Sequence, residues 1–300
     1  MLTINPEDIP VPILHGYILG SVAPRPIALA STIDGNGNPN LSPFSFFNAF
    51  SVNPPIFIFS PARRAKDNST KHTYENAKEV DEVVINVVNY DLVEQASLSS
   101  SDFAKGVNEF EKAGLTPIES ERVKPFRVKE SPVQMECKVN EIIELGENGG
   151  AGNLVICELL LMHIDESILT ESGAIDPQKI DLVSRMGGNW YNRASGDSLF
   201  QINKPVGVVG IGIDCIPMEI RNSAVLTGSE LAILGGVKKI PDQLTDKQDS
   251  EGYLLKKLGV VQDSSQITEE SVHLRAKEML QNNEVEESWA ILLAYYNYKS

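Results

Sequence analysis

A basic segment between residues 61 and 74 is the part of this chain best suited to bind an anion. Its sequence, PARRAKDNSTKHTY, combines four Lys and Arg side chains with a single acid, Asp67, in a chain whose formal net charge is −15. Ser69, Thr70 and Thr73 add hydroxyl groups, and Thr73 is placed to cap a helix that begins at Tyr74. Cations beside a helix N-terminus stabilise a phosphate dianion. The segment therefore predicts a phosphate site, although its composition is equally typical of a solvated basic loop.

A strand-like segment from Ser42 to Ser51, SPFSFFNAFS, offers a surface for a flat aromatic ligand. Side chains alternate between the two faces of a strand. This alternation predicts one face with Phe44, Phe46 and Phe50, and another with Ser45, Phe47 and Ala49. The first face can fill a core, and the second combines an aromatic edge with hydroxyl groups and exposed backbone, which suits a heteroaromatic ring. An aromatic stripe alone is more often core than ligand site.

Other catalytic motifs are weak or absent from the sequence. Residues 207–212, GVVGIG, resemble a dinucleotide-binding glycine pattern, but the spacing is wrong and no helix is expected after them. The four histidines and three cysteines are dispersed, which argues against a metal site and against a disulfide framework. His163, at the end of a predicted strand, is the histidine with most catalytic appeal, although a lone strand histidine is more often structural.

Antiparallel strands are expected to position these residues. A DGNG sequence at 34–37 lies between two apolar runs and indicates a hairpin, and a glycine-rich stretch at 146–152 joins a second pair. The expected strands are residues 27–33, 41–52, 56–60, 83–88, 133–144, 154–164 and 206–213. Only a few short helices interrupt them, so the pattern favours a closed or nearly closed antiparallel barrel over a parallel α/β sheet.

The chain changes character after residue 216, where the pattern becomes helical. Thr268 is expected to start a helix with apolar residues on one face, and Asn283 can cap a last helix. We therefore expect two domains: a barrel over residues 1–216, and a mostly helical extension over residues 217–300 that docks on the barrel or on a partner subunit.

The overall composition is that of a globular protein, with 42% hydrophobic and 22% charged residues. The acidic net charge disfavours binding to nucleic acid and to anionic lipid. No apolar run reaches the about 20 residues needed to span a bilayer, and the N-terminus does not have the pattern of a signal peptide. The sequence predicts a cytoplasmic protein that binds neither nucleic acid nor membrane.

Many segments of this chain, in order, resemble the flavin reductase-like proteins with an FMN-binding split barrel. The similar segments are RPIAL at 25–29, DGNGNPN at 34–40, SPFSFFN at 42–48, NPP at 53–55, KHTYEN at 71–76 and ESPV at 130–133, followed by Arg185, Gly187, Gly188 and Tyr191. The resemblance covers about residues 10–195, and residues 213–235 resemble a longer subgroup of the same family. One departure is His72, which stands where the family commonly has aspartate and makes this region more positive.

The resemblance implies a mainly β fold, a six-stranded antiparallel Greek-key split barrel with short helices, that forms a homodimer and binds FMN. Lys71 and Thr73, helped by Ser60 and Arg64, would hold the FMN phosphate. The isoalloxazine ring would lie along the backbone of Ser45, Phe46, Phe47, Asn48 and Ala49. The residues near the ring or ribityl chain would be Arg25, Ser31 and Thr32, and the candidates for the nicotinamide side are His163 and Arg185.

The activity that the resemblance implies is hydride transfer from NADH or NADPH to flavin. The cofactor carries this chemistry, so no acid–base pair is required. The reduced flavin would serve a partner monooxygenase or another redox protein. Two alternatives stay open: an FMN-binding electron carrier similar to flavoredoxin, without its own NAD(P)H turnover, and a scaffold in which the helical extension covers an inactive site.

Overall fold

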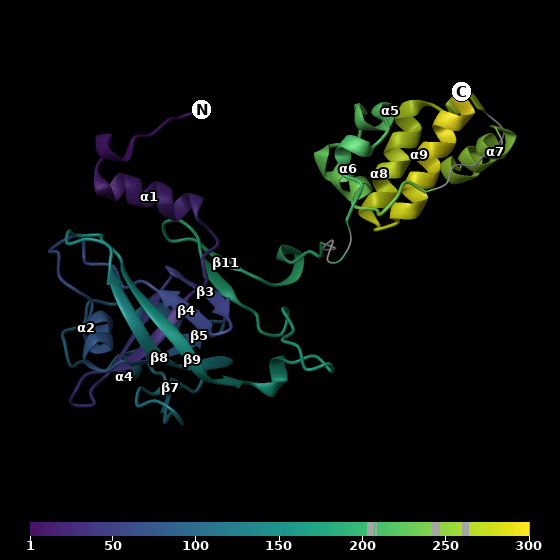
Figure 1. Cartoon of the computed structure of the whole chain (residues 1–300). Helices are drawn as coiled ribbons and strands as arrows, with labels where there is room; N and C mark the ends of the chain where they lie inside the picture. The colour runs from purple at the N-terminus through teal and green to yellow at the C-terminus, as the bar shows by residue number, and fades with distance from the viewer. Residues whose placement is uncertain (203–206, 208, 242–246, 260–263, 300) are drawn as a thin grey trace. The chain divides into compact units, whose positions relative to one another are not determined.

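The chain forms two compact units, Met1–Phe200 and Gln201–Ser300, in a computed structural model (Figure 1). The structure describes residues 1–202, 207, 209–241, 247–259 and 264–299. The first unit is built on a β-sheet and the second on helices. The division between them lies at residue 200, earlier in the chain than the change in composition near residue 216. No helix in the described part of the chain has both the length and the apolar character needed to cross a membrane.

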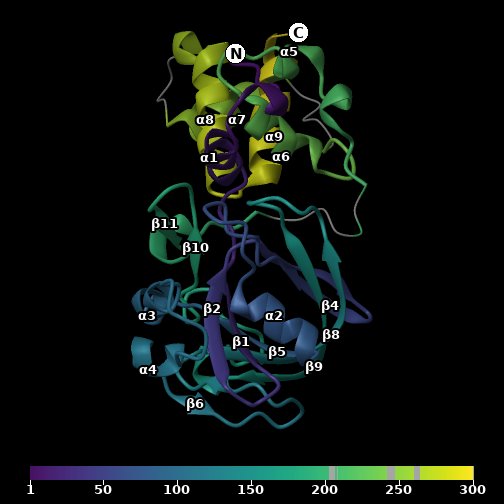
Figure 2. The same ribbon diagram turned by 90° about the vertical axis from the view of Figure 1, so that its left-hand side faces the viewer.

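Seven antiparallel strands form the main sheet of the first unit, in the hydrogen-bonded order β2-β1-β5-β8-β9-β4-β3 (Figure 2). The strands are β1 Ala28–Ile33, β2 Pro39–Phe44, β3 Phe47–Val52, β4 Pro55–Phe59, β5 Glu82–Val87, β8 Val133–Glu144 and β9 Asn153–Ile164. Between β1 and β2, the Gly37 amide donates to the Asp34 carbonyl at 2.9 Å, and the φ of Gly37 is 86°. Both predicted hairpins, β1–β2 and β8–β9, are confirmed.

The strand expected over residues 41–52 is in fact two strands, β2 and β3. They occupy the two edges of the hydrogen-bonded order, so Ser45 and Phe46 carry the chain from one edge of the sheet to the other. At this break the Ser60 amide, just after β4, donates to the Phe46 carbonyl at 2.8 Å. The sheet therefore has seven strands instead of the expected six, and the Greek-key connection stays a prediction.

The break also changes which aromatic side chains face the core. Phe44 and Phe47 both pack inside, with ring centroids 5.5 Å from Phe59 and 6.2 Å from Phe57, respectively. Phe46 and Phe50 are exposed. The prediction that Phe44, Phe46 and Phe50 share one face is wrong, because alternation holds only within an unbroken strand.

Helices and two short ribbons complete the first unit. The α-helices are α1 Val11–Ser21, α2 His72–Glu79, α3 Val93–Leu98 and α4 Glu109–Ala113, and short 3-10 helices lie at Pro6–Asp8, Glu166–Ile168 and Gly196–Ser198. The ribbons are β6 Pro117–Ile118 with β7 Arg127–Val128, and β10 Val183–Arg185 with β11 Tyr191–Arg193. One core lies on the sheet around Phe59 and Ile85, and a second is shared with α3 and α4 around Leu29 and Phe110.

Helix α2 begins earlier than the sequence predicts. Its first residue is His72, its N-cap residue is Lys71, and no side chain caps it. Thr73, the predicted cap, lies inside the first turn, and its buried hydroxyl accepts a hydrogen bond from the Asn40 side chain at 2.9 Å. This hydrogen bond links α2 to β2. The Thr73 hydroxyl is used there and does not cap the helix.

The second unit is a group of helices around an apolar core. Its helices are α5 Met218–Arg221, α6 Gly228–Gly235, α7 Lys247–Leu258, α8 Glu269–Gln281 and α9 Val285–Lys299, with 3-10 helices at Ile213–Cys215 and Ser264–Gln266. The predicted cap of α8 is confirmed, because the Thr268 hydroxyl accepts from the Ser271 amide at 3.1 Å. Trp289 is fully buried in the core, and its indole N–H donates to the Leu234 carbonyl at 3.2 Å.

The late strand predicted over residues 206–213 is wrong where the structure describes it. Residues 206 and 208 lie outside the described residues. Residues 209–212 are in no strand, and Ile213 begins a 3-10 helix. The amides of Ile211 and Gly212 instead donate to carbonyls of Val237 and Gly235, beside the end of α6.

A buried histidine holds part of the second unit together. The His273 ring lies 2.6 Å from the Ser223 hydroxyl through Nδ1 and 3.0 Å from the Tyr296 hydroxyl through Nε2. The Ser223 oxygen already accepts from the amides of Val225 and Leu226, both at 3.0 Å, so its own hydrogen is donated to Nδ1. His273 is therefore neutral with its proton on Nε2, and a second proton would break the bond from Ser223.

We expect the second unit to lose stability as the pH falls below about 6.5, the ordinary pKa of histidine. Burial lowers the pKa of His273, with Glu269 opposing, so the unfolded chain binds a proton that the folded unit does not. The free energy of unfolding should fall by about 1 kcal/mol between pH 7 and pH 5.5. Urea unfolding, followed by Trp289 fluorescence in a Trp190→Phe chain, measures this change. His273→Gln should remove it, and a urea midpoint that does not move between these pH values would contradict it.

Candidate functional site

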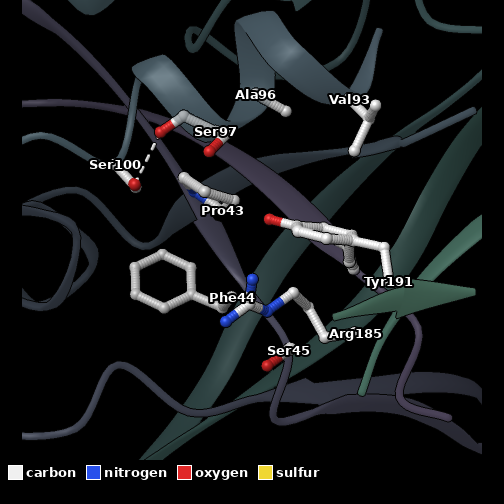
Figure 3. A pocket seen from close by; sticks show the side chains of 10 residues that line it. Pro43, Phe44, Ser45, Val93, Ala96, Ser97, Ser100, Arg185 and Tyr191 are labelled. Atoms are coloured by element: carbon white, nitrogen blue, oxygen red, sulfur yellow. Dashed lines mark hydrogen bonds between the residues drawn. The ribbon is translucent and has the colours of Figure 1, made fainter. Parts of the chain in front are cut away.

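A cavity of about 260 Å³ lies where β2, α3 and the β10–β11 ribbon come together (Figure 3). It is lined by Ile27, Pro43, Phe44, Ser45, Val93, Ala96, Ser97, Ser100, Arg185 and Tyr191. Apolar and aromatic side chains alternate there with hydroxyl groups and one guanidinium. A lining of this kind suits a flat ligand with a polar edge.

Arg185 and Tyr191 form one wall of this first cavity and extend from the ribbon toward the residues of β2 (Figure 3). The Arg185 guanidinium lies 4.6 Å from the centre of the Tyr191 ring, and its Nη2 donates to the Gly188 carbonyl at 2.8 Å. Gly188 permits the tight turn of the ribbon, because its φ is 58°. The wall therefore presents an oriented cation beside an aromatic ring.

A second cavity, of about 20 Å³, continues the first one along β2. Ser100 lines both cavities, and Ser42 of the second is followed directly by Pro43 of the first. The second cavity is lined by Asn40, Ser42, Arg64, Lys71, His72, Thr73, Ser99, Ser100, Ser101, Asp102, Phe103 and Glu109. Together the two cavities make an elongated site with an aromatic end and a basic end.

Lys71 is the cation of the basic end that lacks a partner. Its side chain is partly buried, and within the described part of the chain its ammonium group has no hydrogen bond or ion pair. Burial and the neighbouring Arg64 lower the pKa of Lys71, and Asp102 opposes them. A bound anion would restore the missing counter-charge.

Arg64 is oriented by the loop that carries it. Its Nη1 donates to the Ser69 hydroxyl at 3.2 Å and to the Thr70 carbonyl, and its Nε lies 3.5 Å from the Asp102 carboxylate. Lys66 lies on the same carboxylate at 2.6 Å. Asp102 is thus the ion-pair partner of Arg64 and Lys66, whereas Lys71 has no ion pair among the described residues and can bind a ligand anion.

Arg25 lies behind the first cavity and does not line it. Its buried guanidinium donates to the carbonyls of Leu19 at 2.6 Å and Met186 at 2.8 Å, and to the Ser45 hydroxyl at 3.4 Å. One side chain therefore joins the end of α1, the β10–β11 ribbon and the end of β2. Arg25 positions the cavity walls.

Three further predicted residues, Thr32, Ser60 and Ser31, line neither of the two cavities. The buried Asn40 amide that reaches Thr73 also donates to the Thr32 hydroxyl at 3.3 Å, so Thr32 supports the basic end from within the sheet. The Ser60 hydroxyl accepts from the Asn153 amide at 3.1 Å. The hydroxyl oxygen of Ser31 is buried without a partner among the described residues, and Ser31 is not among the lining residues of either cavity.

Strand β3 supplies no lining residue of the two cavities, whereas Ser45 at the break does. Phe47 packs in the core, and Phe46, Asn48 and Ala49 are exposed. Among the described strands β3 pairs with β4 alone, so its other edge is not hydrogen-bonded to a strand there. Contact of this backbone with a ligand ring stays a prediction.

The structure does not bring His163 to either cavity or into contact with Arg185. His163 lies in β9, and its Nε2 is 2.7 Å from Oε1 of the fully buried Glu136. Glu136 also accepts hydrogen bonds from the amides of Glu121 at 3.0 Å and Arg122 at 2.6 Å. Burial alone would raise the pKa of Glu136, but these hydrogen bonds outweigh it and the pKa is lowered. These contacts indicate a structural role: His163 and Glu136 link β9, β8 and the loop that carries Glu121 and Arg122.

The sequence analysis did not identify two parts of the lining of the first cavity, the residues in and just after α3 and Tyr191. Ser97 and Ser100 reach the first cavity, and the Ser100 hydroxyl donates to the Ser97 carbonyl at 2.6 Å (Figure 3). A usable signal was present in the hydroxyl-rich run SLSSS at 97–101. Tyr191 was part of the resemblance but had no role assigned to it.

Most residues that line the two cavities lie in a part of the chain that matches one protein family. The model of the flavin reductase like domain matches residues 19–179, which is more than half of the chain. The range includes β2, α2 and α3, and ends just before the β10–β11 ribbon. An uncharacterized protein of Aquifex aeolicus is 36% identical over 189 residues, which are 63% of this chain and 94% of that protein.

Two solved structures are similar in fold and in sequence. Nitrilotriacetate monooxygenase component B from Bacillus cereus has a TM-score of 0.63 and 31% identity, with 67% of this chain and 98% of that chain covered. A putative flavin reductase with a split barrel domain from Shewanella frigidimarina has a TM-score of 0.57 and 29% identity, with 68% and 100% covered. About a third of the present chain lies outside each of these matches.

Proposed function

This chain belongs to the flavin reductase-like domain family, and we propose that it is an FMN-dependent oxidoreductase that transfers a hydride from NADH or NADPH to flavin. The observation that carries the proposal is the elongated site along β2. Its aromatic, hydroxyl-lined end fits an isoalloxazine ring. Its basic end offers Lys71 to a phosphate, a partly buried cation that has no ion pair among the described residues.

The chemistry of the lining residues suits each part of FMN. Pro43, Phe44 and Ser45 on one side and Ser97 and Ser100 on the other would enclose the ring. Ser42 and Ser100 would meet the ribityl hydroxyls, and Lys71 with the oriented Arg64 would hold the phosphate dianion. The bound flavin supplies the hydride chemistry, and the protein supplies position and polarity.

The Arg185–Tyr191 wall is our proposed site for the nicotinamide nucleotide. The Tyr191 ring is partly exposed and can stack on a flat group, and Arg185 can attract an anionic nucleotide. Holding two flat rings in contact is the main requirement for hydride transfer, so a general acid or base is not needed. Similarity to a monooxygenase component supports a second protein, a monooxygenase or another redox partner, as the final acceptor.

A homodimer is also part of this proposal. Apolar side chains are exposed on α1 and β3: Val11, Ile13, Tyr17, Ile18, Phe50 and Val52. Helix α1 has no buried residue, although most of its side chains are apolar. Exposed apolar surface of this kind is typical of protein interfaces, and a second copy would bury it symmetrically. Light scattering should therefore give twice the mass of the chain, and the mass of one chain would contradict the dimer.

An anaerobic absorbance spectrum with and without NADH or NADPH tests the proposed function. The purified protein, supplied with FMN, should show a flavin band near ~450 nm that bleaches when the nucleotide is added. A band that resists both nucleotides but yields to dithionite would favour the electron-carrier alternative. Failure to bind FMN at all would contradict the proposal and favour a scaffold.

A further inference from the structure

His72, the first residue of α2, borders the basic end of the site. Its partly buried ring lines the second cavity and also a third, smaller one of about 10 Å³ between the β1–β2 turn and the start of α4. Among the described residues, no hydrogen bond or ion pair involves the ring. The sequence places a titratable group here, one residue after Lys71.

The charges that face His72 come from every element around it. The cations are Arg64 and Lys71 on the loop before α2 and Lys105 on the loop before α4, and the acids are Glu75 on α2, Glu109 on α4, Asp34 in the β1–β2 turn and Asp102 after α3. Several are already paired, since Lys105 lies 2.9 Å from Glu75 and Arg64 lies 3.5 Å from Asp102. Lys71 is therefore the unpaired cation nearest to His72 in sequence.

Without a ligand, these surroundings favour neutral His72. Burial lowers the pKa of His72, Glu75 opposes, and Arg64, Lys105 and Lys71 lower it further. A phosphate dianion held by Lys71 and Arg64 would add negative charge beside His72 and would favour its protonated form. An opposite charge within about 4–6 Å favours the charged form of a side chain and raises the pKa of a histidine by about 1–3.

We propose that His72 takes up a proton when the FMN phosphate binds, so that the protein holds its cofactor more tightly as the pH falls from 8.5 to 6.5. This inference rests on the proposed function and adds a regulation to the same site. His72 then becomes a charged binding residue in the loaded protein, although it is neutral in the free one.

Glu109 is the other titratable group that could couple to the phosphate. Its carboxylate is buried at the edge of the second cavity and accepts from the Leu41 amide at 3.0 Å. Burial raises the pKa of Glu109, and the Leu41 hydrogen bond opposes. A nearby dianion would also favour protonated Glu109. The experiment must therefore distinguish proton uptake by Glu109 from proton uptake by His72.

Binding of FMN and riboflavin by the flavin-free, full-length chain at pH 6.5, 7.5 and 8.5 tests the proposal. The FMN phosphate stays largely dianionic in this range, because its second pKa is about 6. The FMN dissociation constant should rise about tenfold from pH 6.5 to 8.5, one pKa unit of coupling being a factor of ten. Riboflavin, which has no phosphate, should bind equally at all three values. Calorimetry in two buffers of different ionisation enthalpy should detect proton uptake with FMN alone.

Three variants assign the effect to His72. His72→Gln should bind FMN weakly at every pH, and His72→Lys, which keeps a positive charge throughout, should bind it tightly at every pH. Glu109→Gln should keep the pH dependence. An FMN dissociation constant that is constant from pH 6.5 to 8.5, or a dependence that survives in His72→Gln and disappears in Glu109→Gln, would overturn the proposal. Failure of both flavins to bind at any pH would instead contradict the proposed function.

Discussion

Replacing Lys71 with alanine is expected to weaken FMN binding about 100-fold, while riboflavin binding stays the same. A partly buried ammonium group bonded to a phosphate dianion contributes about 1.5–3 kcal/mol, which corresponds to roughly ten- to 150-fold in affinity. Lys71 has no hydrogen bond or ion pair in the described part of the chain, so the phosphate would be its only directly bonded anion there. Fluorescence titration of both flavins at fixed pH and low salt measures the effect.

The Lys71→Ala variant should lose affinity for FMN without losing stability against unfolding. Because burial and Arg64 already disfavour the charge of Lys71 in the free protein, its removal should leave the urea midpoint unchanged or raise it. Lys66→Ala is the matched control, since Lys66 is exposed and already paired with Asp102 at 2.6 Å. That control should change FMN affinity by about threefold or less, as expected of an exposed charge. Equal losses in the two variants would indicate a general charge effect and not a phosphate contact.

The basic end of the site could be predicted from the sequence because its residues are close together in the chain. Arg64 and Lys71 come from one loop, and the helix that follows them was visible in the pattern. The aromatic end is different, because its walls come from residues 43–45, 93–100 and 185–191. Nothing in local periodicity says that these segments meet, so α3 and Tyr191 were missed.

The fold shows the same limit at one position. Strand periodicity located every strand of the main sheet but could not show that the chain leaves the ladder at Ser45 and Phe46. That break depends on pairing with strands distant in sequence, which decide where each edge ends. It reverses the faces predicted for Phe46 and Phe47, and it places Ser45 at the cavity. The functional part of the strand is thus the part where its regular pattern fails.

Replacing Glu136 with alanine is expected to lower the free energy of unfolding of the first unit by about 3–5 kcal/mol. The Glu136 side chain has no exposed surface, and its carboxylate accepts from the amides of Glu121, Arg122 and Val123 and from His163. Alanine would leave these donors without an acceptor and would open a cavity beside them. Urea unfolding at neutral pH measures the loss, and Glu136→Gln, which keeps one acceptor oxygen, should lose less.

The contact between Glu136 and His163 also predicts the role of His163. Because the pKa of Glu136 is lowered in the folded chain, its stabilisation is present above about pH 4.3 and is lost as the pH falls further. If His163 serves mainly as a donor to this carboxylate, His163→Gln should lower the urea midpoint and leave the rate of flavin reduction by NADH unchanged. Its distance from Glu136, 2.7 Å, and its absence from both cavities favour this outcome. A slower hydride transfer with an unchanged midpoint would instead return His163 to the nicotinamide side, and would require a conformation in which the Glu136 contact is broken.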